Sequence, residues 1–314
     1  MILREYLKEK TELLAASAIP DAENEAWVIL LTCTSRSRAE LRFLLPEPVE
    51  KALSPSVLSQ LEAVFSRRAK REPLAYIVGH APFYDMEFSV GKGVLIPRFD
   101  TEILVESALS GLGLDAVSPG LSSDIPKISS WTPDMDRPVV IFDLCTGSGI
   151  IGITLASILK KRNIQCKVVM TEISEEAAAY AKKNVKDLLS DPDEMVKVEI
   201  ADLWPSEDPE KADLIVTNPP YISEEEMQVL LPEVREFEPS LALTDEGDGL
   251  TMYRRILSGA GQYVNAGGGL FMEHGCDQAG ALKDLMCGRW ESITCVQDYG
   301  HRDRVTCGIY RGEA

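Results

Sequence analysis

The stretch VVIFDLCTGSGIIGITLA, residues 139–156, decides the fold of this 314-residue chain. Its first residues are apolar, which predicts a buried β-strand that closes at Asp143. The small residues of the TGSG turn, 146–149, then open a helical pattern, and they let a ligand approach the backbone and the free N–H groups of the helix. A strand, a glycine-rich turn and a helix in this order are typical of a nucleotide-type site at the carboxyl edge of a parallel sheet.

Strand and helix patterns alternate from residue 138 onward. Apolar runs predict seven strands, at 138–144, 166–171, 195–200, 212–217, 268–273, 292–297 and 303–310. This alternation predicts an α/β fold with a mostly parallel sheet and helices on both faces. Because the last two strands are joined by too few residues for a crossover helix, we expect them to pair antiparallel.

The chain divides into three parts by pattern. Residues 1–75 carry apolar side chains at the spacing of four short helices, which predicts a small helical bundle. Residues 76–97 alternate between apolar and polar positions around glycines, which predicts a β-hairpin linker. The main domain is predicted to span 98–314, and within it residues 110–138 have the composition of a loop or flexible insertion.

Two features near these boundaries carry charge. The basic run at 67–71 ends the last predicted helix of the bundle, where it suits a helix C-terminus and a solvated face better than a grip on a partner. Asp100 and Thr101 precede an apolar segment, at a place where a helix N-cap is expected.

Composition excludes several classes of protein. The chain is 45% hydrophobic and 26% charged, and no apolar run approaches the roughly 20 residues that cross a membrane. Its N-terminus mixes acids and bases, unlike a signal peptide, so we expect a cytoplasmic protein that does not engage membranes. The seven cysteines include no C-x-x-C pair and there are three histidines, so we expect free thiols and no metal.

The net charge of −18 is unevenly distributed. Residues 1–75 hold 11 basic and 11 acidic side chains, whereas residues 76–314 hold 21 and 39. Binding to a phosphate backbone depends on Lys and Arg, so the acidic part favours a protein or small-molecule substrate over nucleic acid.

Acidic residues close the next two predicted strands. Glu172 ends the strand that follows the glycine-rich turn, where a carboxylate can accept both hydroxyl protons of a ribose. Asp202 follows the third strand and is placed to form the next wall of the pocket, beside an adenine. The alternative for each is an acid of a turn or of a helix N-terminus.

The fourth strand leads into Asn218-Pro219-Pro220-Tyr221. A conjugated amide or amino nitrogen is a poor nucleophile, so both of its protons must be accepted before its lone pair can face a methyl donor. The side-chain oxygen of Asn218 and the backbone carbonyl of Pro219 supply two acceptors, and the prolines stiffen the turn. Tyr221 adds a π face against a flat group or a sulfonium.

The chain resembles the release-factor glutamine methyltransferases, the PrmC/HemK family, over nearly its whole length. The resemblance rests on PLAYIVG at 73–79, LIPRFDTEILVE at 95–106, DLCTGSG at 143–149, TNPPYI at 217–222, GGGLFMEHG at 267–275 and DYGHRDRVTCGIY at 298–310. It implies a Rossmann-like class I domain that uses S-adenosylmethionine and releases S-adenosylhomocysteine. It also implies methylation of N5 of the glutamine in the Gly-Gly-Gln motif of class I peptide release factors, with the helical bundle contacting that substrate.

By position, the resemblance also implies site residues. The cofactor-binding set is Asp143, Cys145, Thr146, Gly147, Ser148, Gly149, Glu172, Asp202, Leu203 and Asn218. The catalytic set is Asn218, Pro219, Pro220 and Tyr221, and these bind the substrate together with Arg98, Asp100, Thr101 and Glu102.

Three departures from the family pattern leave the NPPY segment intact. Cys145 stands where the family has glycine, Phe99 replaces a proline, and the 110–138 loop is longer. The alternatives are a glutamine methyltransferase of a ribosomal protein, an adenine N6-methyltransferase of nucleic acid, and a cofactor-binding module without activity. We expect a monomer with mobile domains.

Overall fold

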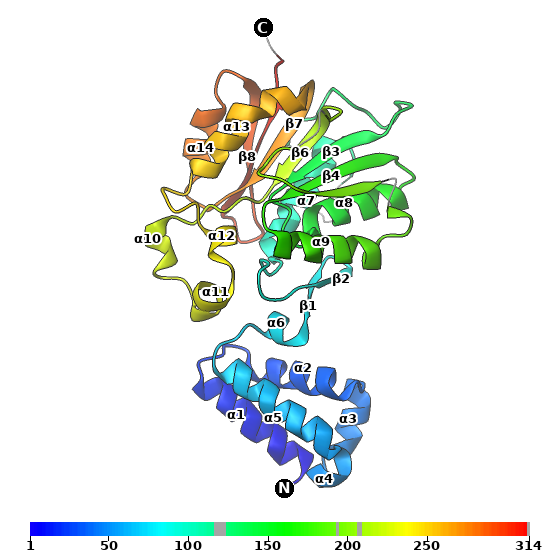
Figure 1. Ribbon diagram of the computed structural model, residues 1–314, viewed down its shortest axis with the longest axis vertical. Coiled ribbons are helices and arrows are strands. Elements are labelled where there is room, and N and C mark those ends of the chain that lie inside the picture. The colour runs from blue at the N-terminus through cyan, green and yellow to red at the C-terminus, as the bar shows by residue number, and fades with distance from the viewer. Residues whose placement is uncertain (116–123, 193–194, 206–208, 313–314) are drawn as a thin grey trace. The chain divides into compact units, whose positions relative to one another are not determined.

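The computed structural model describes residues 1–115, 124–192, 195–205 and 209–312 (Figure 1). The chain divides into two compact units. The first, a helical unit, consists of Met1–His80 together with Leu231–Phe237, and the second, a sheet unit, consists of Ala81–Leu230 and Glu238–Ala314. One short segment of the C-terminal half therefore folds with the N-terminal helices.

Short helices build the helical unit. They are α1 (Leu3–Ala16), α2 (Ala22–Thr34), α3 (Arg38–Leu44), α4 (Val49–Ala52), α5 (Pro55–Ala69), α6 (Leu74–Val78) and α11 (Pro232–Phe237). Buried Leu3, Ile29, Leu30, Leu41 and Phe65 belong to one apolar core of this unit. The predicted bundle is confirmed, but α4, α6 and α11 were not predicted, and α6 occupies the start of the range 76–97 that was expected to be hairpin.

Helix starts in this unit follow the expected chemistry in part. The Ser54 hydroxyl accepts a hydrogen bond from the Val57 amide, and Pro55 takes the first position of α5. Asp21 stands at the N-cap of α2, yet its side chain makes no capping hydrogen bond.

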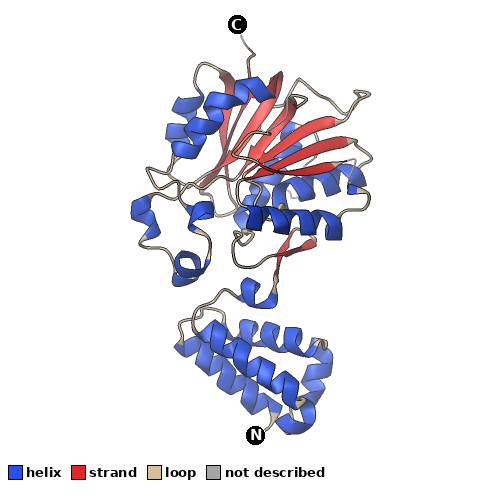
Figure 2. Ribbon diagram, viewed as in Figure 1, coloured by secondary structure: helices blue, strands red, loops and turns tan. Residues whose placement is uncertain are grey.

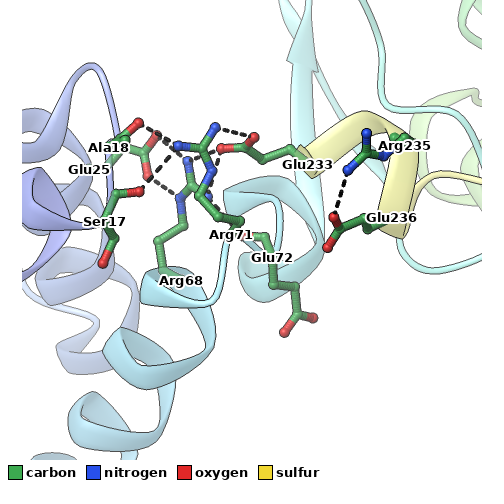
Figure 3. A network of polar contacts seen from close by, with 9 residues as sticks. All are labelled: Ser17, Ala18, Glu25, Arg68, Arg71, Glu72, Glu233, Arg235 and Glu236. Atoms are coloured by element: carbon green, nitrogen blue, oxygen red, sulfur yellow. Dashed lines mark hydrogen bonds and ion pairs between the residues drawn. The ribbon is translucent and has the colours of Figure 1, made fainter. Parts of the chain in front are cut away.

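The basic run at the end of α5 is only in part the solvated face that was expected: Arg67 and Lys70 are exposed, whereas Arg68 and Arg71 are engaged inside the unit. The Arg68 side chain is buried and binds Glu25 and Glu233, and Arg71 also binds Glu233 (Figure 3). Glu233 belongs to α11, so these arginines join a distant segment of the chain to the bundle. No local pattern predicts this contact, because the partner carboxylate lies more than 160 residues away.

A seven-stranded sheet forms the centre of the sheet unit (Figure 2). Its strands are β3 (Val139–Leu144), β4 (Cys166–Glu172), β5 (Val196–Ile200), β6 (Ala212–Thr217), β7 (Val264–Glu273), β8 (Trp290–Gln297) and β9 (Asp303–Tyr310). Their order is β5-β4-β3-β6-β7-β9-β8. The strands β5, β4, β3, β6 and β7 pair in parallel, whereas β9 pairs antiparallel with both β7 and β8, as predicted.

Helices pack on both faces of this sheet (Figure 1). Val139 and Ile141 of β3 belong to one apolar core, shared with α7 (Glu102–Gly111), α8 (Ile150–Lys161) and α9 (Glu175–Leu188). Val140 and Phe142 belong to the other, shared with α13 (Thr251–Tyr263) and α14 (Ala279–Met286). Alternate side chains of one strand thus enter opposite cores, which is why the central strands are apolar throughout.

The remaining elements are short. A hairpin of β1 (His80–Phe83) and β2 (Met86–Ser89) precedes the sheet, and α10 (Glu224–Met227) and α12 (Ser240–Leu243) lie between β6 and α13. Of the predicted 110–138 loop, residues 116–123 lie outside the described part, and 124–138 contain no helix or strand. Ile125, Ile128 and Trp131 nevertheless enter the apolar core beside α7. No helix of the described residues is long and apolar enough to cross a bilayer.

Candidate active site

A cavity of about 350 Å³ lies in the sheet unit, beside the ends of β3, β4 and β6. Its walls come from four places in the sequence: residues 93–98, the turn after β3, the end of β4 with residues 201–203, and residues 239–246. Asn218 and Pro220 also line it. This is the carboxyl edge of the parallel strands, where ligands bind in doubly wound folds.

Asp143 fastens the glycine-rich turn. Its Oδ2 atom accepts hydrogen bonds from the Thr146 hydroxyl and, at 2.9 Å, from the Gly152 amide. Its Oδ1 atom is buried and has no hydrogen-bond partner among the described residues. Burial raises the pKa of this carboxyl to about 7.

The turn itself needs an unusual backbone. Cys145, Gly147 and Gly149 all have positive φ, at 56°, 58° and 88°. A Cβ at Gly149 would lie 2.8 Å from both Ile153 Cδ1 and Met170 Cε, so a side chain there would force the core apart. Cys145 accepts the left-handed conformation that glycine adopts more readily, and burial raises the pKa of its thiol.

Glu172 binds two backbone amides. Oε2 accepts from Gly147 N and Oε1 from Ser174 N, both at 2.9 Å, so the carboxylate links the turn after β3 to the end of β4. Asp202 is paired with Arg255 at 2.7 Å on the opposite wall. Leu203, with φ 68°, also lines the cavity, and its carbonyl accepts a hydrogen bond from the Thr171 hydroxyl.

The NPPY segment continues from β6. Asn218 is half-buried, and its Nδ2 atom donates to the Thr101 hydroxyl oxygen at 3.3 Å. Pro219 is buried, and the Tyr221 carbonyl accepts a hydrogen bond of 2.9 Å from Gln278 Nε2. Burial raises the pKa of the Tyr221 phenol, so this group stays protonated and neutral.

The segment from Ile96 to Arg98 forms one wall and is held by a buried acid. Glu238 accepts a hydrogen bond from the Ile96 amide at 3.1 Å and pairs with the Arg98 guanidinium. Phe99, which follows, is 70% exposed. The Arg98 charge is thus already partnered, and Glu238 is a residue of the site that the sequence analysis missed.

Thr101 occupies the N-cap position of α7, as expected of this segment, but its side chain makes no capping hydrogen bond. Asp100 and Thr101 lie in a 3-10 turn, η1 (Phe99–Thr101), that runs directly into α7. Asp100 pairs with Arg304 at 3.2 Å, and Glu102 accepts a hydrogen bond from the Tyr84 amide. The turn instead buries the Thr101 hydroxyl against Asn218.

The structure brings most of the predicted residues to one cavity. Its lining includes Arg98, Thr101, Cys145, Thr146, Gly147, Ser148, Glu172, Asp202, Leu203, Asn218 and Pro220. The others support it from outside the lining: Asp100, Glu102, Asp143, Gly149, Pro219 and Tyr221.

Glu273 is a second buried acid that the sequence analysis left without a role. It ends β7, the strand beside β6, and the side chains of Thr101 and Asn218 act on its carboxyl by favouring the ionised form, which lowers its pKa. An acid that closes an apolar strand was the signal used for Glu172, and the same signal is present in the GGGLFMEHG stretch.

Comparisons with known proteins agree with this geometry. Residues 5–79 match the PrmC N-terminal domain, and residues 128–236 match the methyltransferase small domain. The release factor glutamine methyltransferase of Haemophilus influenzae is 31% identical over 99% of this chain and 100% of its own length. That of Vibrio cholerae is 34% identical over 98% of this chain and 96% of its own.

This chain belongs to the release factor glutamine methyltransferase family. The family resemblance inferred from the sequence is thereby confirmed, as is the prediction of a methyltransferase enzyme. Among solved structures, the catalytic domain of hMettl16 in complex with MAT2A 3′UTR hairpin 6 has a TM-score of 0.51 and 16% identity. The match covers 82% of this chain and 83% of the hMettl16 chain. At this identity it supports the methyltransferase fold alone.

Proposed function

We propose that this enzyme transfers the methyl group of S-adenosylmethionine to N5 of the glutamine in the Gly-Gly-Gln motif of class I peptide release factors. The observation that carries the proposal is the Asn218 amide beside the cavity, whose NH₂ group is engaged by Thr101. The names of full-length relatives support the substrate. Recognition of the release factor is assigned to the helical bundle, residues 1–75, of a monomeric enzyme.

The cavity fits the cofactor. Asp143 Oδ1, buried without a partner in the described chain, suits an ammonium group close to the TGSG turn. At Gly147 an added Cβ would meet only Val94 Cγ2, at 3.9 Å, so backbone is open to an approaching ligand there. Glu172, Asp202 and Leu203 line the cavity, where Glu172 would bind the ribose, Asp202 would lie beside the adenine and Leu203 would add an apolar contact. When bound, S-adenosylmethionine supplies the electrophilic methyl group.

The residues of the chain would contribute to the reaction rate mainly by positioning the substrate amide. An amide nitrogen is weakly nucleophilic, so rate depends on holding its plane and its lone pair in line with the methyl carbon. Asn218 Oδ1 and the Pro219 carbonyl would accept the two amide protons and fix that plane. The neutral Tyr221 phenol adds no charge that would repel or trap the substrate.

Mass spectrometry of a purified release factor, incubated with the enzyme and S-adenosylmethionine, tests this proposal. We expect one added methyl on the glutamine of Gly-Gly-Gln, and none with Asn218→Ala or with a release factor in which that glutamine is replaced. An unmodified release factor, with cofactor binding shown by calorimetry, would refute the substrate. Ribosomal proteins and nucleic acid, incubated in parallel, would then identify which alternative holds.

A further inference from the structure

Glu273 is the most thoroughly buried acid next to the NPPY segment. Its side chain is 1% exposed, and its Oε2 atom has no hydrogen-bond partner within the described residues. Glu273 and Asn218 follow paired residues of neighbouring strands, and the side chains of Asn218 and Thr101 favour the ionised carboxyl, as hydrogen-bond donors do. Burying a carboxyl costs free energy unless all its oxygens are paired or hydrogen-bonded, so an acid kept here in place of an apolar side chain points to a role.

The contacts of Asn218 depend on which way its amide faces. The oxygen and nitrogen of such a group are told apart by their hydrogen-bond partners. A carboxylate only accepts, so the Asn218 atom that it binds is the NH₂ nitrogen. The Thr101 oxygen accepts from Asn218 Nδ2 at 3.3 Å, which leaves its one proton for Glu273, whose ionised form Thr101 favours. Both partners therefore select the same orientation.

We propose that Glu273 and Thr101 are positioning residues that lock the Asn218 amide with its Oδ1 oxygen directed toward the substrate. The inference rests on the proposed function, because only a substrate with N–H donors needs that oxygen. A flipped Asn218 would present NH₂ to the NH₂ of the substrate amide, and the donor pair would repel. The lock would remove this unproductive state before the substrate arrives.

The groups around Glu273 define its charge. Arg304 from β9, Asp100 from η1, and the phenols of Tyr221 and Tyr253 face it. Burial raises the pKa of this carboxyl to about 7, while Thr101, Arg304 and Asn218 oppose that rise. The ionised form accepts from Asn218, whereas the protonated form has an O–H that can compete for Asn218 Oδ1. The kcat for methyl transfer is therefore expected to rise with pH through about 7.

Four variants separate positioning from general disruption. Glu273→Gln introduces an NH₂ group that can bind Asn218 Oδ1, and Thr101→Val removes the hydroxyl at nearly constant shape. Each is expected to lower kcat on the order of 100-fold, similar to the loss of one preorganised polar group at other active sites. Thr101→Ser should recover most of that loss. Glu106→Gln serves as the matched control and should keep the wild-type kcat. Glu106 is another buried carboxyl, and it accepts a hydrogen bond from the Tyr84 hydroxyl.

The KM for the release factor and the Kd for S-adenosylmethionine should change less than about threefold in these variants, because neither residue is expected to carry ground-state binding. The pH dependence near 7 should disappear in Glu273→Gln. If Glu273→Gln keeps the wild-type kcat, or Thr101→Ser is as slow as Thr101→Val, the proposal is wrong.

A second measurement needs no substrate. In ¹⁵N-labelled enzyme, the side-chain NH₂ signals of Asn218, identified by their loss in Asn218→Ala, should exchange slowly with solvent. Both Glu273→Gln and Thr101→Val should speed that exchange by at least tenfold, while Glu106→Gln should not. Unchanged exchange in both would overturn the lock. Failure of the wild type to methylate the release factor would instead refute the proposed function and leave this result standing.

Discussion

At the scale of single residues, the site is defined by carboxylates that bind the backbone or another side chain. Glu172 holds two amides, Asp143 holds the glycine-rich turn, and Glu238 holds the wall at Ile96. Acids at strand ends can be found in a sequence, which is how Glu172 was predicted. The hydrogen-bond partners of these acids cannot be found in the sequence, because a pair such as Ile96 and Glu238 is separated by 142 residues.

Asp143 should make the stability of the cofactor-free enzyme depend on pH. Its folded pKa, about 7, lies above the ordinary value near 3.9, so the folded protein retains a proton that the unfolded chain has released. This contribution is complete below about pH 4 and is lost as pH rises through 7. The free energy of unfolding of Asp143→Asn, relative to wild type, should therefore increase between pH 4.5 and 7.5, on the order of 1–3 kcal/mol.

Urea unfolding at several pH values measures that difference. Comparison with wild type at each pH cancels other titrating groups, including Glu273, whose pKa is also raised to about 7. A difference that is constant or falls across this range would contradict the assignment of the proton to Asp143.

At the scale of elements, the pattern of apolar residues predicted the strands of the sheet and missed the shortest helices. The seven strands carry apolar runs, so their approximate ranges were predicted correctly, and helices do lie between most of them. The helices α4 and α6 have four and five residues, too few for a helical period to stand out. The N-cap position at Thr101 was predicted, but its hydroxyl contacts Asn218 instead of capping α7, and such a tertiary contact leaves no local pattern.

The cavity wall from Ile96 to Arg98 should lose order when Glu238 loses its charge. The Glu238 side chain is 1% exposed, so Glu238→Gln removes the charge that holds Arg98 at a place where water cannot take over the role of the carboxylate. We expect the Kd for S-adenosylmethionine to rise about 5- to 20-fold, equivalent to roughly 1–2 kcal/mol, because this wall lines the cavity. Glu225→Gln, on exposed α10, is the control. Calorimetric titration giving equal affinities for both variants would exclude the role of this pair.

At the scale of the whole molecule, the division into units does not follow the order of the chain. The predicted boundary near residue 75 described a contiguous bundle, whereas α11 belongs to the helical unit through Glu233. Composition gave no indication of this, since residues 231–237 resemble any short amphipathic segment. Only the folded contacts with Arg68 and Arg71 reveal it (Figure 3).

Loss of the Glu233 charge should release α11 from the bundle. Arg68 and Arg71 are largely buried at this contact, so Glu233→Gln leaves their charges only partly compensated. Hydrogen exchange of the amides in 231–237 should accelerate at least tenfold. Glu236→Gln provides the matched control, since Glu236 pairs with the exposed Arg235 in the same helix. Equal exchange in the two variants would show that the ion pairs do not hold this segment.

The late position of α11 has a consequence for biosynthesis. A ribosome makes the N-terminal helices first, and they can collapse on their apolar core while the chain is still growing. Arg68 can meet Glu25 at that stage, but Glu233 exists only after most of the sheet unit has been translated. The helical unit is therefore complete only after residues 231–237 have been translated. A truncated product that ends before residue 231 carries an incomplete helical unit.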